Sequence, residues 1–346
     1  MTMNERRRMP AEWEPVGAVM VAMPHAGTDW AYMLKEVEAC YDHLVRAIAR
    51  HAVAIVIAPE ATSLRERFAD IPADRLLLCD VPTNDTWTRD YGPITVREGE
   101  RTILCDFGFN AWGGKFEYRL DNAVTAHLHS CGLLQGTLED RNDYILEGGS
   151  IESDGCGTIL TTDSCMLTDT RNRVDRAGCE AYLAEALGAH HVLWLDHGAL
   201  AGDDTDGHID TLARLAPGDT ILYCASSADE QADEQTEELE AMARTLRYFR
   251  TPDGRPYNLV ELPLPHPIYD AEGQRLPATY ANFLVVNDAI LMPTYGQPRK
   301  DKLAEMTLRV AFPDHTVECV DCRALIQQHG SLHCATMQLP QDVLPI

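Results

Sequence analysis

The segment AYMLKEVEACYDHLVRAIARHAVAIVIA, residues 31–58, holds both patterns that decide the fold class. Its first part, Ala31–Arg50, has apolar residues at helical spacing, and its last part, Val53–Ala58, is an apolar run of strand length. The same alternation continues along the chain. Short strands that alternate with helices predict an α/β or α+β architecture.

The rest of the chain supplies further elements and no clear break between them. Other stretches of strand length are Val16–Met23, Leu76–Val81, Thr102–Phe107, Thr158–Thr162, Thr220–Cys224, Phe283–Val286 and Ala289–Pro293. Other helical patterns are Asp121–Cys131, Arg176–Leu187, Ala228–Tyr248 and Lys302–Phe312. The proline-rich stretch Pro252–Pro277 reads as a long surface loop. Because no Pro/Gly/Ser-rich linker separates two halves, we expect one domain over residues 1–346.

The composition excludes some partners. The 54 acidic and 29 basic residues give a formal charge of −25, which repels nucleic acid and attracts small cations. The apolar runs are shorter than the roughly 18 residues of a membrane span, and the N-terminus lacks a signal-peptide pattern. We therefore expect a cytoplasmic protein that binds neither nucleic acid nor membrane.

Eleven scattered cysteines do not indicate a disulfide framework or a zinc site. Only Cys319 and Cys322 form a CxxC, and no second pair or matched histidines follow. One cysteine is a candidate nucleophile, Cys334, which stands in Gly330–Ser–Leu–His–Cys–Ala–Thr336 near the C-terminus. A cysteine nucleophile needs an acid/base partner, usually a histidine that the fold brings close.

That histidine could come from the acidic run Asp203–Asp210, where His208 and Asp210 would point to the same side of an extended segment. Three interpretations of this pair stay open at this point. It could ligate a metal, take part in acid/base chemistry, or merely belong to a polar turn.

Further polar candidates follow at wide intervals. They are Asp90 and Trp87 in WTRDYGP, Glu147 before Gly148–Gly149, and Asn282 in YANF. Intervals of 57, 61, 74 and 52 residues separate Asp90, Glu147, His208, Asn282 and Cys334 in that order. Each interval could hold one strand-and-helix unit that delivers one side chain to a shared centre, although spacing alone does not establish this.

A centre with several carboxylates would repel itself unless a cation lies within it. The cation could be a metal ion or a guanidinium, whose paired N–H donors match carboxylates. In the second case, Cys334 would attack the guanidinium carbon.

Seven motifs in order resemble the agmatine deiminase family, which includes the bacterial peptidylarginine deiminases. The motifs are WTRDYGP (87–93), FNAWGGKF (109–116), LEGGSIESDGCGTILTT (146–162), DTDGHIDTL (204–212), YANFLVVND (280–288), ILMPTYG (290–296) and GSLHCATMQ (330–338). One departure is local: the family's GGGNIHC is Gln328–His–Gly–Ser–Leu–His–Cys334 here.

The resemblance implies a five-bladed α/β propeller with pseudo-fivefold symmetry, the pentein fold. It implies a C–N hydrolase, agmatine deiminase (agmatine iminohydrolase), which needs no metal or cofactor and serves polyamine (putrescine) biosynthesis. The implied roles are Cys334 as nucleophile, His208 as acid and then base, Glu147 as the residue that orients His208, Asp90 and Asp210 as guanidinium ligands, Trp87 as a channel residue, and Asn282 as a neighbour of the site.

The expected partner is a small cationic guanidino substrate, and homo-oligomerisation is left open. Acidic and aromatic residues around FNAWGGKF and 202–206 favour agmatine, with Asp204 as the contact for its distal ammonium. The alternatives are deimination of peptidylarginine or free arginine to citrulline, a metal-dependent amidohydrolase, an amidinotransferase, and a non-catalytic polyamine-binding protein.

Overall fold

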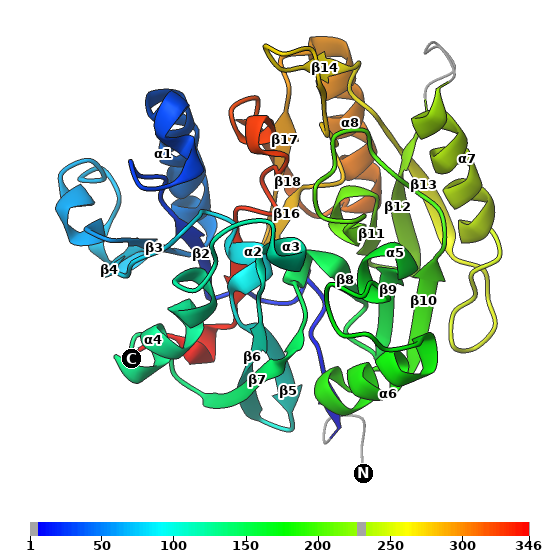
Figure 1. The fold of residues 1–346 in the computed structure, drawn as a ribbon, viewed down its shortest axis with the longest axis horizontal. Coiled ribbons are helices and arrows are strands. Elements are labelled where there is room, and N and C mark those ends of the chain that lie inside the picture. The colour runs from blue at the N-terminus through cyan, green and yellow to red at the C-terminus, as the bar shows by residue number, and fades with distance from the viewer. Residues whose placement is uncertain (1–5, 227–232, 346) are drawn as a thin grey trace.

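The computed structural model describes residues 6–226 and 233–345, in which the larger sheets share one pattern (Figure 1). Three of these sheets have three strands each. They are β8-β9-β10 (Ile151–Ser153, Thr158–Thr162, His191–Leu195), β11-β12-β13 (Ala213–Ala216, Thr220–Ala225, Asn258–Pro263) and β16-β17-β18 (Leu284–Val286, Ala289–Thr294, Thr316–Asp321). In each, the first two strands pair antiparallel and the third pairs parallel to the second.

Two sheets add a fourth strand to the same pattern. They are β1-β5-β6-β7 (Arg7–Arg8, Ile94–Glu98, Arg101–Gly108, Thr137–Ile145) and β19-β2-β3-β4 (Met337–Leu339, Ala18–Ala22, Val53–Ala58, Leu76–Asp80). Strand β19, near the C-terminus, pairs antiparallel with β2, near the N-terminus. This pairing closes a ring of five sheets.

Each parallel pair requires a crossover, and helices supply it. The helices are α1 (Leu34–His51), α2 (Thr88–Tyr91), α3 (Ala111–Gly114), α4 (Val124–Ser130), α5 (Asp163–Met166), α6 (Arg176–Leu187), α7 (Glu234–Leu246) and α8 (Pro298–Ala311). Helix α1 joins β2 to β3, α7 joins β12 to β13, and α8 joins β17 to β18. In Figure 1, α1, α6 and α7 lie toward the outside and α2 near the middle. The chain thus has the predicted pentein fold, with five α/β units.

The expected strands and helices correspond to elements of the structure, apart from local differences at their ends. The predicted helix 228–248 begins in residues outside the described part of the chain, and its remainder contains α7. The interpretation of Pro252–Pro277 as a long loop is wrong. It contains β13, which pairs with β12, and a hairpin of β14 (Ile268–Tyr269) and β15 (Arg275–Leu276).

Apolar packing holds the ring together. Most buried apolar side chains form one cluster, and a second lies where β5 and β6 meet α6. In the described residues, every helix is either too short or too polar to cross a lipid bilayer.

Candidate active site

The candidate residues occupy equivalent places in the five units. Asp90, Glu147, Asp210, Asn282 and Cys334 each lie two to four residues before the first strand of their unit. Those strands are β5, β8, β11, β16 and β19, respectively. The recurrence in the sequence therefore follows from the architecture, because each unit enters its sheet from the centre of the ring.

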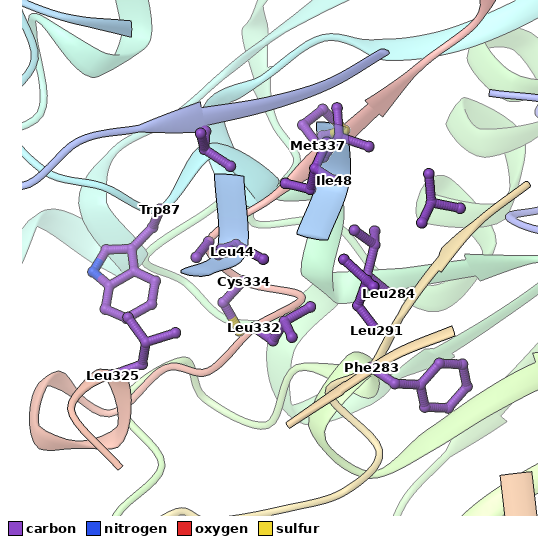
Figure 2. Packing of buried hydrophobic residues seen from close by; sticks show 14 of the residues in the cluster. Leu44, Ile48, Trp87, Phe283, Leu284, Leu291, Leu325, Leu332, Cys334 and Met337 are labelled. Carbon is purple, nitrogen blue, oxygen red and sulfur yellow. The ribbon is translucent and has the colours of Figure 1, made fainter. Parts of the chain in front are cut away.

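Cys334 is a buried thiol surrounded by polar partners. Its Sγ lies 3.2 Å from Asn282 Nδ2 and 3.6 Å from Asp210 Oδ2. Figure 2 shows Cys334 among buried hydrophobic side chains, including Trp87 and Leu332. Apolar walls and a few polar groups at the sulfur are the usual environment of a nucleophile protected from bulk water.

All the hydrogen bonds of Asp210 fall on one of its two oxygens. Oδ2 accepts from His333 Nδ1 at 2.8 Å and from Asn282 Nδ2 at 3.2 Å. Oδ1 is buried and has no hydrogen-bond partner among the described residues. A buried acceptor without a donor is costly, so this oxygen is placed to receive a donor from a ligand.

Asp90 is fixed at both oxygens. Oδ1 accepts from the Gly149 backbone N–H and Oδ2 from Trp112 Nε1, each at 3.0 Å. Gly149 is required here, because a Cβ would lie 2.7 Å from His208 Nδ1 and 2.9 Å from Asp90 Oδ1. The backbone beside Glu147 therefore packs directly against the two acids and the histidine.

His208 lies between two carboxylates. Nδ1 is 3.7 Å from Asp90 Oδ1, and Nε2 is 3.8 Å from Glu147 Oε2. The ring is fully buried, and neither nitrogen makes a hydrogen bond within the described residues. Burial disfavours the charged imidazole, but the Asp90 carboxylate, Cys165 and Glu147 outweigh it and raise the pKa of His208 well above its ordinary value. The residue can therefore hold a proton to donate.

His208 and Asp210 do not lie on an extended strand as the sequence suggested. Asp210 stands in a 3-10 turn, η7 (Ile209–Thr211), which follows His208 directly. The turn still places both side chains in the same buried region, because a Cβ at Gly149 would contact both of them.

Glu147 is held by an arginine that the sequence analysis missed. Arg171 Nε lies 2.8 Å and 3.0 Å from the two carboxylate oxygens, and both side chains are buried. Burial opposes ionisation, but His208 and Arg171 lower the pKa of Glu147 to about 2. Glu147 is thus an anion beside His208 in any ordinary buffer.

A pocket leads from Cys334 and Asp90 to the surface. It is lined by Asp29, Asp85, Trp87, Asp90, Trp112, Phe116, Asp204, Thr205, Gln328, His329, Gly330 and Cys334. Gly330 has no room for a side chain, since a Cβ would come within 2.3 Å of the Trp87 ring. At the mouth of the pocket, Asp204 forms an ion pair with Lys115, whose Nζ lies 3.0 Å from Asp204 Oδ1. Four candidate residues, Trp87, Asp90, Asp204 and Cys334, therefore share one pocket.

The thiol of Cys334 is expected to be protonated before substrate arrives. Burial, together with the Asp210 and Asp90 carboxylates, raises its pKa well above the ordinary thiol value. Alkylation by iodoacetamide, which needs the thiolate, should therefore be slow at neutral pH and accelerate only in strongly alkaline buffer. Peptide mass spectrometry can follow it, with the exposed Cys131 as internal reference. Labelling of Cys334 as rapid as that of Cys131 at neutral pH would contradict this charge assignment.

Two groups in the described residues have ligand atoms close enough to hold a metal: Glu147–Cys165–His208 and Glu12–Glu152–His333. Neither combines His208 with Asp210, the pair considered from the sequence. Each already contains a guanidinium, since Arg171 pairs with Glu147 and Arg214 pairs with Glu12 and Glu152. The carboxylates of both groups are thus already paired with arginine side chains of the protein.

Three residues near the site were not singled out from the sequence: Trp112, Arg171 and His333. Trp112 stands in FNAWGGKF and His333 directly before Cys334, so the motifs included both without indicating their contacts. Arg171 lies outside every motif, and only the fold shows its pairing with Glu147.

Fold and site together define a class of protein. A five-unit α/β propeller with a central cysteine, histidine and several carboxylates is the arrangement of the guanidine-modifying enzymes that the sequence motifs resemble. The comparisons with known proteins agree. The chain belongs to the Porphyromonas-type peptidyl-arginine deiminase family, whose pattern it matches over residues 8–340.

Individual relatives cover nearly the whole chain. Agmatine deiminase of Ectopseudomonas mendocina is 32% identical, over 96% of this chain and 95% of its own. A cysteine-to-serine variant of C. jejuni agmatine deiminase, solved with substrate bound, is 36% identical, with a TM-score of 0.90 over 98% and 97% of the two chains. A Porphyromonas gingivalis protein, described provisionally as an arginine deiminase, is 46% identical, with a TM-score of 0.91 over 98% and 100%.

Proposed function

We propose that the protein is an agmatine deiminase, with residues 1–346 as a single catalytic domain. One observation carries the choice of substrate. The pocket that reaches Cys334 is lined by four aspartates and three aromatic side chains, and by no lysine or arginine of the described residues. Agmatine has a guanidinium at one end and an ammonium at the other, so both ends suit such a pocket. The α-carboxylate of free arginine would be repelled there.

In the proposed reaction, Asp90 and Asp210 hold the guanidinium beside Cys334. The bound cation offsets the negative potential that keeps the thiol protonated, so the thiol releases its proton to solvent and becomes the thiolate. The thiolate attacks the guanidinium carbon and forms a C–S bond. His208 gives its proton to the departing nitrogen, which leaves as ammonia.

The remaining steps restore the enzyme. The S-alkylthiouronium that stays on Cys334 is attacked by water, which passes a proton to His208. The C–S bond then breaks, the departing sulfur takes the proton of the carbon-bound hydroxyl, and N-carbamoylputrescine leaves with a urea oxygen derived from water. Glu147, itself held by Arg171, stabilises the charge on His208 during both halves of the reaction. Asn282 donates a hydrogen bond from Nδ2 to the sulfur of Cys334 and steadies its position.

We further propose that the enzyme works in the cytoplasm, in the formation of putrescine. The chemistry of the product supports this role, because hydrolysis of the carbamoyl group of N-carbamoylputrescine releases putrescine.

The family and one relative favour a second candidate substrate, arginine or peptidyl-arginine. A specific feature supports it as well: Lys115 Nζ lies at the mouth beside Asp204 and could meet a substrate carboxylate. A product assay with agmatine, arginine and a peptidyl-arginine, which measures ammonia and the ureido product, decides between them. We expect the highest kcat/KM for agmatine. A higher value for either arginine substrate would reverse the choice, and turnover of none would overturn deimination itself.

The Asp204→Asn variant tests the distal end of the pocket. Because Asp204 is partly exposed and already paired with Lys115, we expect a modest rise of KM for agmatine, about two- to fivefold, and little change in kcat. A contact remote from the reacting carbon binds ground state and transition state about equally. Arginine should be affected less than agmatine.

Lys115→Met is the matched partner of this variant. It removes the competing ammonium, so KM for agmatine should fall. An equal effect of Asp204→Asn on both substrates, or a large loss of arginine turnover in Lys115→Met, would contradict the placement of an ammonium beside Asp204.

A further inference from the structure

A chain of buried polar contacts leads away from the active site behind Asp210. His333, which is fully buried, donates from Nδ1 to Asp210 Oδ2 at 2.8 Å. Its other nitrogen, Nε2, lies 2.6 Å from Glu12 Oε1. Arg214 Nη2 also lies 3.1 Å from Nε2, so both nitrogens of the ring are held, one by Asp210 and the other by Glu12 and Arg214.

Glu12 lies in a different cavity from the one that is proposed to hold the substrate. It lines a second pocket with Glu14, Arg89 and Met337, and this pocket shares no lining residue with the one that reaches Cys334. Arg89 and Arg214 also pair with Glu12. A change at Glu12 can therefore reach the reaction only through the protein.

The charged groups that surround His333 are Glu12, Glu152, Asp210, Arg89 and Arg214. Of these, only Asp210 belongs to the substrate site. Its Oδ2 takes the bond from His333, and its Oδ1 is left without a partner in the described residues. The contact from His333, the shorter of the two that Oδ2 receives beside that from Asn282, thus helps to decide which oxygen faces the substrate.

We infer that Glu12 is a positioning residue that acts through His333 to fix Asp210 with one oxygen bound and the other open to the substrate guanidinium. This role rests on the proposed deimination, in which Asp210 must be ionised to hold that cation. His333 therefore has a function distinct from that of the adjacent Cys334.

The test is the pH profile of kcat/KM for agmatine in Glu12→Gln. Without the Glu12 carboxylate, the His333 ring loses the partner that holds its Nε2, so its hydrogen bond from Nδ1, which favours the Asp210 anion, weakens. The acid limb should therefore move to higher pH by about one unit, which corresponds to an about tenfold loss on that limb. Burial opposes ionisation of Asp210, but the hydrogen bond from His333 and the nearby cations outweigh it and lower the pKa of Asp210 below its ordinary value.

Glu14→Gln is the matched control. Glu14 lines the same pocket and pairs with an arginine, Arg8, but it has no contact with His333. It should keep the parental pH profile. Thermal unfolding of both variants separates loss of folded protein from a shift of the limb. If the parent is active and Glu12→Gln and Glu14→Gln have equal pH profiles, the inference about Glu12 is overturned while the proposed deimination stands.

A second variant, His333→Asn, keeps an N–H near Asp210 but breaks the link to Glu12. It should shift the acid limb in the same direction, and adding Glu12→Gln to it should change nothing more. Should Glu12→Gln fail to fold, this variant decides: a shifted limb supports the role, and a parental limb overturns it. A parent that turns over no guanidino compound would instead overturn the proposed function, and the role of Glu12 with it.

Discussion

Replacement of Cys334 by serine is expected to reduce agmatine turnover by several orders of magnitude without unfolding the protein. A serine hydroxyl ionises far less readily than a thiol, and the surrounding carboxylates of Asp90 and Asp210 oppose its ionisation further. The fold should tolerate the change, because the hydroxyl can donate to Asp210 and accept from Asn282 at the place of the sulfur. Steady-state kinetics and equilibrium binding of agmatine measure the two effects separately.

Cys224→Ser is the matched control for this prediction. Cys224 is also fully buried, and its thiol contacts the Thr211 carbonyl and the Thr279 hydroxyl rather than the site. We expect it to keep nearly parental activity. Substantial turnover by Cys334→Ser, or an equal loss in Cys224→Ser, would remove the basis for a covalent mechanism at Cys334.

Asp90→Asn and Asp210→Asn should each lower kcat/KM by about 100-fold or more. Each removes a charged partner of a buried guanidinium, and hydrogen bonds to charged groups are worth about 1.5–3 kcal/mol. Asn at position 90 has a further defect. Its amide can accept only one of the two N–H donors, from Gly149 and Trp112, that now bind the carboxylate.

Asp29→Asn controls for the general loss of negative charge in the pocket. Asp29 lines the same pocket but takes no part in the contacts around Cys334. We expect its kcat/KM to stay within about threefold of the parent, as for an exposed charge. A similar loss in all three variants would mean that overall charge, and not the two specific ligands, governs substrate binding.

The sequence predicted the parts of the site that lie on the ring of five units. Asp90, Glu147, Asp210, Asn282 and Cys334 recur because each unit presents one residue just before its first strand. Apolar runs such as Val53–Ala58 were recognisable as strands because they are buried over nearly their whole length. The catalytic roles of the five site residues remain predictions, which the variants above test.

What the sequence could not indicate depends on long-range packing. Strand β13 was missed because its residues, Asn258–Pro263, are mostly exposed or half-buried and lie among prolines, and only pairing with β12 makes them a strand. Arg171 contacts Glu147, and Glu12 contacts His333 behind Asp210, both from segments without any motif. Likewise, the pairing of Lys115 with Asp204 joins residues far apart in the chain, so the acidic run appeared less neutralised than it is.

The central claim is that agmatine is deiminated through a covalent bond to Cys334, and acid quenching during turnover tests it most directly. The parent enzyme, mixed with agmatine, quenched in acid and digested, should yield the peptide that contains Cys334 with the mass of agmatine minus ammonia added. N-carbamoylputrescine should appear in the same sample. Formation of this product with the Cys334 peptide unmodified at every quench time, and at an undiminished rate in Cys334→Ser, would contradict the claim.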